Sequence, residues 1–186
     1  MPLDTKGSIN FQDLMLHRIH EILLVASPYD AFILEEDGRL TQQILYEYLG
    51  MNLSYAPRVW HAKDAKTGLK QLADRSYDLV IVMMRIADMD PITFGERVKK
   101  TNPDKPVILL AFDESEIYML PQKRLAKTID RVYIWSGNAN VFPAIIKNIE
   151  DKMNIERDYR IAGIRSIVMV EDNPRYYSIV LPLLYR

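Results

Sequence analysis

The residues of this chain that could carry chemistry are carboxylates, hydroxyls and three histidines, because the sequence contains no cysteine. Disulfides, thiolate metal sites and thiol nucleophiles are therefore excluded. His17 and His20 stand in the order HxxHE, which differs from the HExxH pattern of zinc hydrolases, so a helix surface is the simpler interpretation. His61 is also expected to be structural. The glycines form no phosphate-binding loop, and no spacing supports a Ser-His-Asp arrangement.

The composition places the chain among soluble globular proteins. It has 186 residues, 48% of them hydrophobic and 26% charged, with a net charge of −1. This charge predicts no nucleic-acid partner and no anionic membrane partner. No apolar run approaches the roughly 20 residues that span a bilayer, and the N-terminus lacks a signal-peptide pattern. We expect a cytoplasmic protein.

Short apolar runs alternate with helical patterns along most of the chain. The runs lack polar alternation, which is typical of parallel strands covered on both faces. The expected strands are residues 21–27, 58–62, 78–84, 106–112 and 131–135. Helical patterns follow each strand; one of them, at residues 114–128, is interrupted by Pro121. Residues 28–40 mix acidic and apolar side chains and are expected to form an excursion before a helix that begins near Thr41 and stops at Gly50.

This alternation predicts an α/β fold of three layers, with a doubly wound parallel sheet of five strands. The flavodoxin-like order 2-1-3-4-5 is the most economical arrangement. In such sheets the functional site lies beyond the carboxyl ends of the strands.

The C-terminal part begins the pattern again. Residues 151–163 are a polar extension of the last helix and end at a glycine. The run SIVMVEDNP then repeats EILLVASPY about 145 residues later. We therefore divide the chain into an N-terminal helical extension (1–19), a main domain (20–153), a linker (154–164) and the start of a second unit (165–186).

The order of elements and the residues at the strand ends resemble those of the receiver (CheY-like) domain of bacterial two-component response regulators. DLVIVMMRIADMDP resembles the third strand and following loop, PVILLAF the fourth strand, and SIVMVEDNP a first strand with its acidic pair. The resemblance implies a phosphorelay chemistry. In it, the acidic pair and an acceptor aspartate bind Mg²⁺, and a hydroxyl and a lysine respond to the phosphoryl group.

The main domain departs from the receiver pattern at every position that this chemistry needs. The acidic pair falls on Ala26 and Ser27, and the acceptor falls on Met83. The switch hydroxyl falls on Ala111, and the lysine falls near Ser136 or Gly137. The resemblance therefore implies a pseudo-receiver with a degenerate phosphorylation pocket, without catalytic residues, metal or cofactor.

The second unit keeps more of the pattern. Glu171 and Asp172 fit the acidic pair, so an intact second receiver is expected to bind Mg²⁺. A degenerate receiver ahead of a fuller one is similar to the front of large bacterial proteins that end in a phosphoenolpyruvate synthase-like, pyruvate-binding region.

Other residues near the expected pocket allow two interpretations. Asp88, Asp90 and Asp113 follow strands and could replace the acceptor, although turn formation is the favoured interpretation. Ser27 and Ser136 could line a pocket that holds water or a small ligand. The segment 28–40 either covers the pocket or contacts a neighbouring domain.

The leading hypothesis is a non-enzymatic signalling module that docks a protein partner, a downstream domain or a second copy of itself. The alternatives are a regulatory small-molecule site in the old phosphorylation pocket, and the N-terminal scaffold of an enzyme whose catalysis lies after Arg186.

Overall fold

Five parallel strands form the centre of the molecule in a computed structural model, which describes residues 14–36, 39–50 and 55–185. The strands are β1 (Glu21–Val25), β2 (Arg58–Ala62), β3 (Leu79–Met83), β4 (Val107–Ala111) and β5 (Arg131–Ile134). Their order is β2-β1-β3-β4-β5, and every neighbouring pair is parallel. The predicted fold class and strand order are confirmed.

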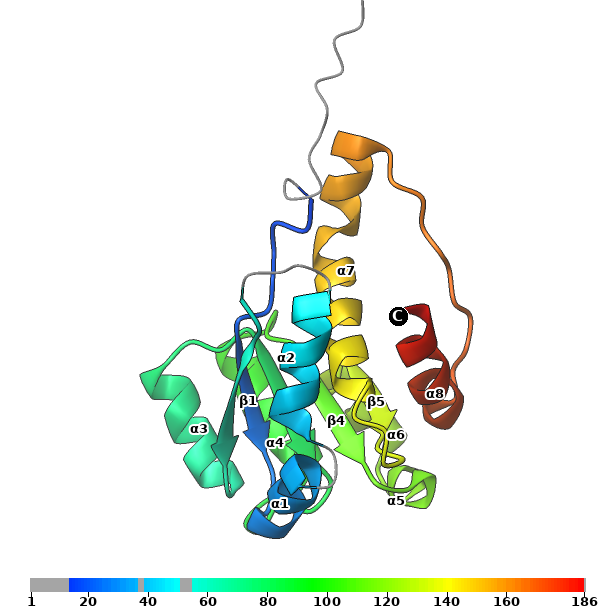
Figure 1. Cartoon of the computed structure of the whole chain (residues 1–186). Helices are drawn as coiled ribbons and strands as arrows, with labels where there is room; N and C mark the ends of the chain where they lie inside the picture. The colour runs from blue at the N-terminus through cyan, green and yellow to red at the C-terminus, as the bar shows by residue number, and fades with distance from the viewer. Residues whose placement is uncertain (1–13, 37–38, 51–54, 186) are drawn as a thin grey trace, which may run out of the picture.

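Helices cover both faces of the sheet (Figure 1). They are α1 (Pro28–Glu36), α2 (Leu40–Gly50), α3 (Ala65–Asp74), α4 (Pro91–Thr101), α5 (Glu114–Tyr118), α6 (Gln122–Thr128), α7 (Val141–Ala162) and α8 (Pro174–Leu184). Apolar residues of α1, α2, α7 and α8 share one buried cluster with the sheet, and those of α3 to α6 share the other. The three-layer arrangement is confirmed.

The strands are buried because their sequences are apolar on both faces. All five residues of β3 and all five of β4 are buried. Gly68 of α3 allows a close approach to β1, since a Cβ on Gly68 would lie 3.0 Å from Cγ2 of Val25. Pro121 separates α5 from α6, as the sequence predicts.

The expected N-terminal helix is absent from residues 14–19, which run without regular secondary structure, and residues 1–13 lie outside the described residues. The amides of Met15, His17 and Ile19 donate to side chains of α7 and are therefore not used in a helix. The prediction of helix over residues 14–19 is wrong because it considered only the apolar spacing and not this tertiary pairing.

The segment 154–164, expected as a linker, is helical for most of its length, as the expected polar extension of the last helix over residues 151–163 implies. Helix α7 continues to Ala162 and extends well past the sheet (Figure 1). It ends where predicted, at Gly163, whose φ of 58° is a left-handed conformation that glycine adopts easily. Asn154 and Asp158 are buried against the N-terminal segment, which explains why the helix persists.

The second unit forms a helix but not a strand. Residues 163–173 run back beside α7 without regular structure, and α8 follows them (Figure 1). Asn173 caps α8, because its side chain accepts a hydrogen bond from the amide of Arg175 at 2.8 Å. A strand at 166–170 would need a free sheet edge for its backbone groups, and α8 covers the outer edge of β5.

The excursion at 28–40 is largely helical. Helix α1 begins after Ser27, whose Oγ accepts a hydrogen bond from the amide of Asp30 at 3.1 Å. Leu34 is fully buried, whereas Tyr29 and Phe32 are exposed. Residues 37 and 38 lie outside the described residues.

Candidate functional site

The carboxyl edge, meaning the side of the sheet where the strands end, is apolar at its centre. The register pairs Val25 with Val82, so Ala26 and Met83 follow on neighbouring strands. Both side chains are fully buried and belong to the cluster that includes Leu34 of α1 and Phe142 of α7. Neither can supply a carboxylate, and a thioether is a poor ligand for Mg²⁺.

The structure does not gather the remaining predicted pocket residues around Met83. Ala111 is fully buried but belongs to the cluster on the opposite face of the sheet. Ser27 is half-buried and its hydroxyl caps α1, while Ser136 is exposed after β5. The centre of the carboxyl edge is therefore filled by apolar side chains, and the hydroxyls of Ser27 and Ser136 lie away from it.

The three aspartates considered as replacement acceptors all accept backbone amides at helix starts. Asp90 Oδ1 accepts from the amide of Thr93 at 2.9 Å and caps α4. Asp113 Oδ1 accepts from the amide of Ser115 at 2.7 Å and caps α5. The two oxygens of Asp88 accept from the amides of Ala65 and Lys66 at 2.8 and 3.0 Å, at the start of α3.

These hydrogen bonds stabilise the charged form of the caps. Those from Ser115 hold the pKa of Asp113 below its ordinary value. Burial raises the pKa of Asp90, but hydrogen bonds from Thr93 and the charge of Arg124 outweigh burial and lower it. The turn-forming interpretation of these aspartates agrees with their geometry.

One carboxylate near the carboxyl edge was not singled out by the sequence. Asp30 is only 4% exposed and lies one helical turn before the buried Leu34, on the inner side of α1. Its Oδ2 has no hydrogen-bond partner among the described residues. The spacing Ser27-x-x-Asp30, typical of a helix start, was the available signal, but it does not predict burial.

The acidic pair of the second unit lies in the segment before α8. Glu171 Oε1 accepts from the amide of Asn173 at 2.9 Å, and Asp172 is exposed. Within the described parts of the chain, no group of three or more histidines or carboxylates is placed to hold a metal ion. The role of Glu171 and Asp172 as Mg²⁺ ligands in an intact receiver stays a prediction.

A second polar region lies along α7 and was missed by the sequence analysis. Glu150, Asn154 and Asp158, which we call the α7 polar stripe, are all buried and recur every four residues. Glu150 accepts from the amide of Ile19 at 2.9 Å. Asn154 accepts from the amide of His17 at 2.8 Å, and Asp158 accepts from the amide of Met15 at 2.9 Å.

The spacing of the stripe explains this pairing. Four helical residues rise about 6 Å, and two extended residues span about 6.6 Å, so each stripe residue meets every second amide of the N-terminal segment. Asn154 also donates to the carbonyl of His17 at 2.7 Å. The stripe therefore binds the backbone of residues 15–19 through side chains of α7.

Glu150 anchors the stripe in the core. Its Oε2 accepts from Lys147 Nζ at 2.9 Å, and its Oε1 also accepts from the hydroxyl of Tyr48 on α2 at 3.2 Å. Burial and the charge of Glu150 raise the pKa of Tyr48 far above its ordinary value. This buried ion pair joins α2, α7 and the N-terminal segment.

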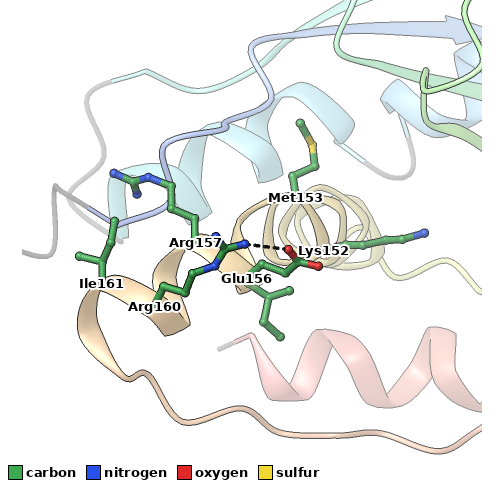
Figure 2. Close-up of a pocket in the computed structure, with 7 residues that line it drawn as sticks. Lys152, Met153, Glu156, Arg157, Arg160 and Ile161 are labelled. Carbon is green, nitrogen blue, oxygen red and sulfur yellow. Dashed lines mark hydrogen bonds and ion pairs between the residues drawn. The ribbon is translucent and has the colours of Figure 1, made fainter.

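Two hollows lie along the part of α7 that extends past the sheet. One, of about 540 Å³, lies between α7, residues 164–169 and α8. The other, of about 460 Å³, is lined by residues of α7 alone. Figure 2 shows that the latter residues point away from the helix in different directions, with an ion pair of 3.2 Å between Arg160 and Glu156. This second hollow is an open helix surface.

No model of a protein family matches the sequence, and no curated protein matches it. Solved structures of receiver domains do match. The signal receiver domain of an HD domain-containing protein from Pseudomonas fluorescens Pf-5 is 26% identical, with a TM-score of 0.56, over 77% of this chain and 95% of that domain. A CheY-like receiver domain protein from Methanospirillum hungatei JF-1 is 20% identical, with a TM-score of 0.55, over 74% and 98% of the two chains.

The chemotaxis response regulator CheY4 of Vibrio cholerae is 14% identical, with a TM-score of 0.53, over 70% of this chain and 98% of its own. The chain therefore has the receiver fold of two-component signalling proteins. A separate finding is that no helix in the described ranges is long and apolar enough to cross a bilayer.

Proposed function

We propose that residues 20–153 form a receiver-like signalling and interaction module that does not accept phosphate and has no catalytic activity. The observation that carries the proposal is the burial of Ala26 and Met83 in one apolar cluster at the carboxyl edge. The nearby Asp88, Asp90 and Asp113 support it, because their side chains are engaged at helix starts. The module acts through its surfaces, toward a protein partner, another domain of its own chain or a second copy.

Beryllofluoride with Mg²⁺ tests the loss of phosphate acceptance. This anion mimics the phosphoryl group on an acceptor aspartate, so a receiver that keeps its acidic pair serves as the positive control. We expect the amide spectrum and the melting temperature of residues 20–153 to stay unchanged. A metal-dependent shift at Ala26 and Met83 would overturn the proposal.

Residues 165–186 are, in this proposal, the start of a second receiver, because they keep the acidic pair Glu171 and Asp172. A longer chain that carries the second acceptor aspartate is expected to bind Mg²⁺, and the double substitution E171Q/D172N should abolish that binding. Mg²⁺ titration by calorimetry measures it. The proposal of an enzyme scaffold ahead of a phosphoenolpyruvate synthase-like region rests on the sequence resemblance alone.

A regulatory small-molecule site is the second candidate function, and Asp30 favours it. A ligand with a hydrogen-bond donor would satisfy the unpartnered Oδ2 beside the apolar cluster. A thermal-shift screen of small cationic and hydroxylated compounds should then give saturable stabilisation that D30N removes. Equal stabilisation of the wild type and D30N would eliminate this candidate.

A further inference from the structure

The outer edge of β5 is the end of the sheet, and α8 covers it. Trp135 donates its amide to the carbonyl of Ala111 on β4 at 2.7 Å. Because strand residues alternate in direction, the backbone groups of Val132 and Ile134 face away from β4. These are the groups with which a sixth strand would pair.

Two adjacent hydroxyls of α8 take the place of that strand. Ser178 Oγ accepts from the amide of Ile134 at 2.9 Å, and Tyr177 donates its hydroxyl to the carbonyl of Val132. In a parallel ladder, one residue opposite Tyr133 would use its own amide and carbonyl for these same two bonds. Helix α8 thus mimics one residue of a parallel strand.

The remaining bonds of α8 lie near its two ends. Asn173 donates to Glu114 on α5 at 2.9 Å, and Tyr185 donates its hydroxyl to Asp151 on α7 at 2.6 Å. The Tyr177 ring meets Tyr133 edge-on with centroids 5.5 Å apart. The part of α8 that faces β5 is narrow, since Ile179, Val180 and Leu183 are exposed.

The segment before α8 has the character of an unpaired strand. Ile167 and Val168 are each 82% exposed and Val170 is 92% exposed, although β-branched residues favour strands. Residues 164–173 contain no strand or helix. An exposed apolar run of this kind is a template for pairing with a free sheet edge.

We propose that α8 masks a strand-addition site on β5, and that the occupant after its release is residues 166–170 of a second copy of this chain. The same chain cannot supply that strand while α7 keeps its length. The 22 residues of α7 span about 33 Å, whereas residues 166–170 as a strand span about 14 Å between their first and last Cα atoms. The four Cα–Cα steps from Ala162 to Ser166 can return at most about 15 Å of the difference of about 19 Å.

This inference rests on the proposed interaction role. It adds the partner, a second copy of the chain, and the element that blocks the site, helix α8. It is independent of phosphate acceptance, so the beryllofluoride experiment and the experiment below can fail separately. Pairing with β5 and incorporation into a second receiver are mutually exclusive uses of residues 166–170. The test therefore uses residues 1–186.

The substitution pair Y177F/S178A removes both hydroxyls and keeps the packing of α8. A synthetic peptide of residues 164–172 is then titrated into the variant and the wild type. We expect saturable binding at least about tenfold tighter in the variant, with shifts at the amides of Val132 and Ile134 measured by NMR. The same peptide with Val168→Pro should not bind, because proline cannot continue the ladder. Sedimentation should show that the variant alone dimerises more strongly than the wild type.

Absence of peptide-dependent shifts at Ile134 in either protein would overturn the inference. So would equal binding of the proline peptide. Should Y177F/S178A fail to fold, as judged by circular dichroism, N173A/Y185F loosens both ends of α8 without changing the β5 edge. This second variant is expected to show the same gain in peptide binding, and an unchanged affinity would equally refute the proposal.

Discussion

The carboxyl edge of the sheet and the inner side of α7 contrast in how they treat polar residues. At the carboxyl edge, where receiver chemistry needs carboxylates, Ala26 and Met83 are buried in an apolar cluster. Along α7, where a helix normally presents apolar side chains, Glu150, Asn154 and Asp158 are buried and hydrogen-bonded. The carboxyl edge thus buries apolar side chains, whereas α7 buries polar side chains that hold two chain segments together.

The contrast teaches that burial alone does not identify a functional site. Each stripe residue of α7 has a backbone partner, so its desolvation is compensated. Asp30, beside the carboxyl edge, has an oxygen without one among the described residues. A ligand or a conformational change that gives the unpartnered group a hydrogen bond would stabilise the protein, whereas the larger polar cluster already has its hydrogen bonds.

The largest expected effect comes from returning a carboxylate to the carboxyl edge. M83D should destabilise the domain by about 5 kcal/mol at pH 7, because the apolar cluster offers no partner for the charge. Burial raises the folded-state pKa of such a carboxyl, so the loss should shrink as the pH falls toward 5. M83L is the matched control and should cost less than about 1.5 kcal/mol. Urea denaturation at both pH values measures this, and a stable M83D at pH 7 would contradict the apolar description.

The next effect tests the ion pair at the base of the stripe. E150A should lower the free energy of unfolding by about 3–5 kcal/mol, because it leaves Lys147 buried without its partner. The double substitution K147M/E150L should cost clearly less, since it removes both charges. Denaturant unfolding of the three proteins gives the comparison. A loss in K147M/E150L as large as that in E150A would contradict this explanation.

A substitution of Asp30 should stabilise the domain, in contrast to the substitutions of Met83 and Glu150. D30N is expected to raise the free energy of unfolding by about 1 kcal/mol, because the side chain no longer buries a charge with an unpartnered oxygen. D88N is the matched control and should be destabilising, because both oxygens of Asp88 accept helix amides and asparagine keeps one. Parallel thermal melts distinguish the two signs. A loss of stability in D30N would contradict the description of Oδ2 as unpartnered.

The smallest effect concerns the cap of α4. D90A should cost about 1 kcal/mol at pH 7. The pKa of Asp90 is lower in the folded than in the unfolded state, so its contribution is complete above the unfolded value near 4 and disappears as the pH falls through the folded value. The difference between D90A and the wild type should therefore shrink as the pH falls below about 4. D90N, which caps without titrating in this range, should show no such change.

The fold could be predicted because short stretches of sequence specify each strand and helix. Runs such as LVIVM in β3 and VILLA in β4 are too apolar and too short for anything but buried strands. Their alternation with helices then permits few topologies. The burial of Met83 at the end of β3 could also be predicted, because it closes an uninterrupted apolar run.

The features that could not be predicted from the sequence depend on contacts between distant segments. The pairing of Ile19 with Glu150 joins residues 131 positions apart, and no local pattern distinguishes it from an amphipathic helix start. The burial of Asp30 depends on α1 forming where a loop was expected. Tyr177 and Ser178 looked like ordinary helix residues, because the edge that they cover is created only by the assembled sheet.

The length of α7 has a mechanical consequence. The helix starts just beyond β5 and runs about 33 Å as a rod. A tilt of about 5° at Val141 would displace its far end by about 3 Å, given that length. A small tilt of α7 near the sheet would therefore displace the N-terminal segment and residues 163–173 by several ångströms. The rigid helix thus amplifies movements of the sheet at both of those segments.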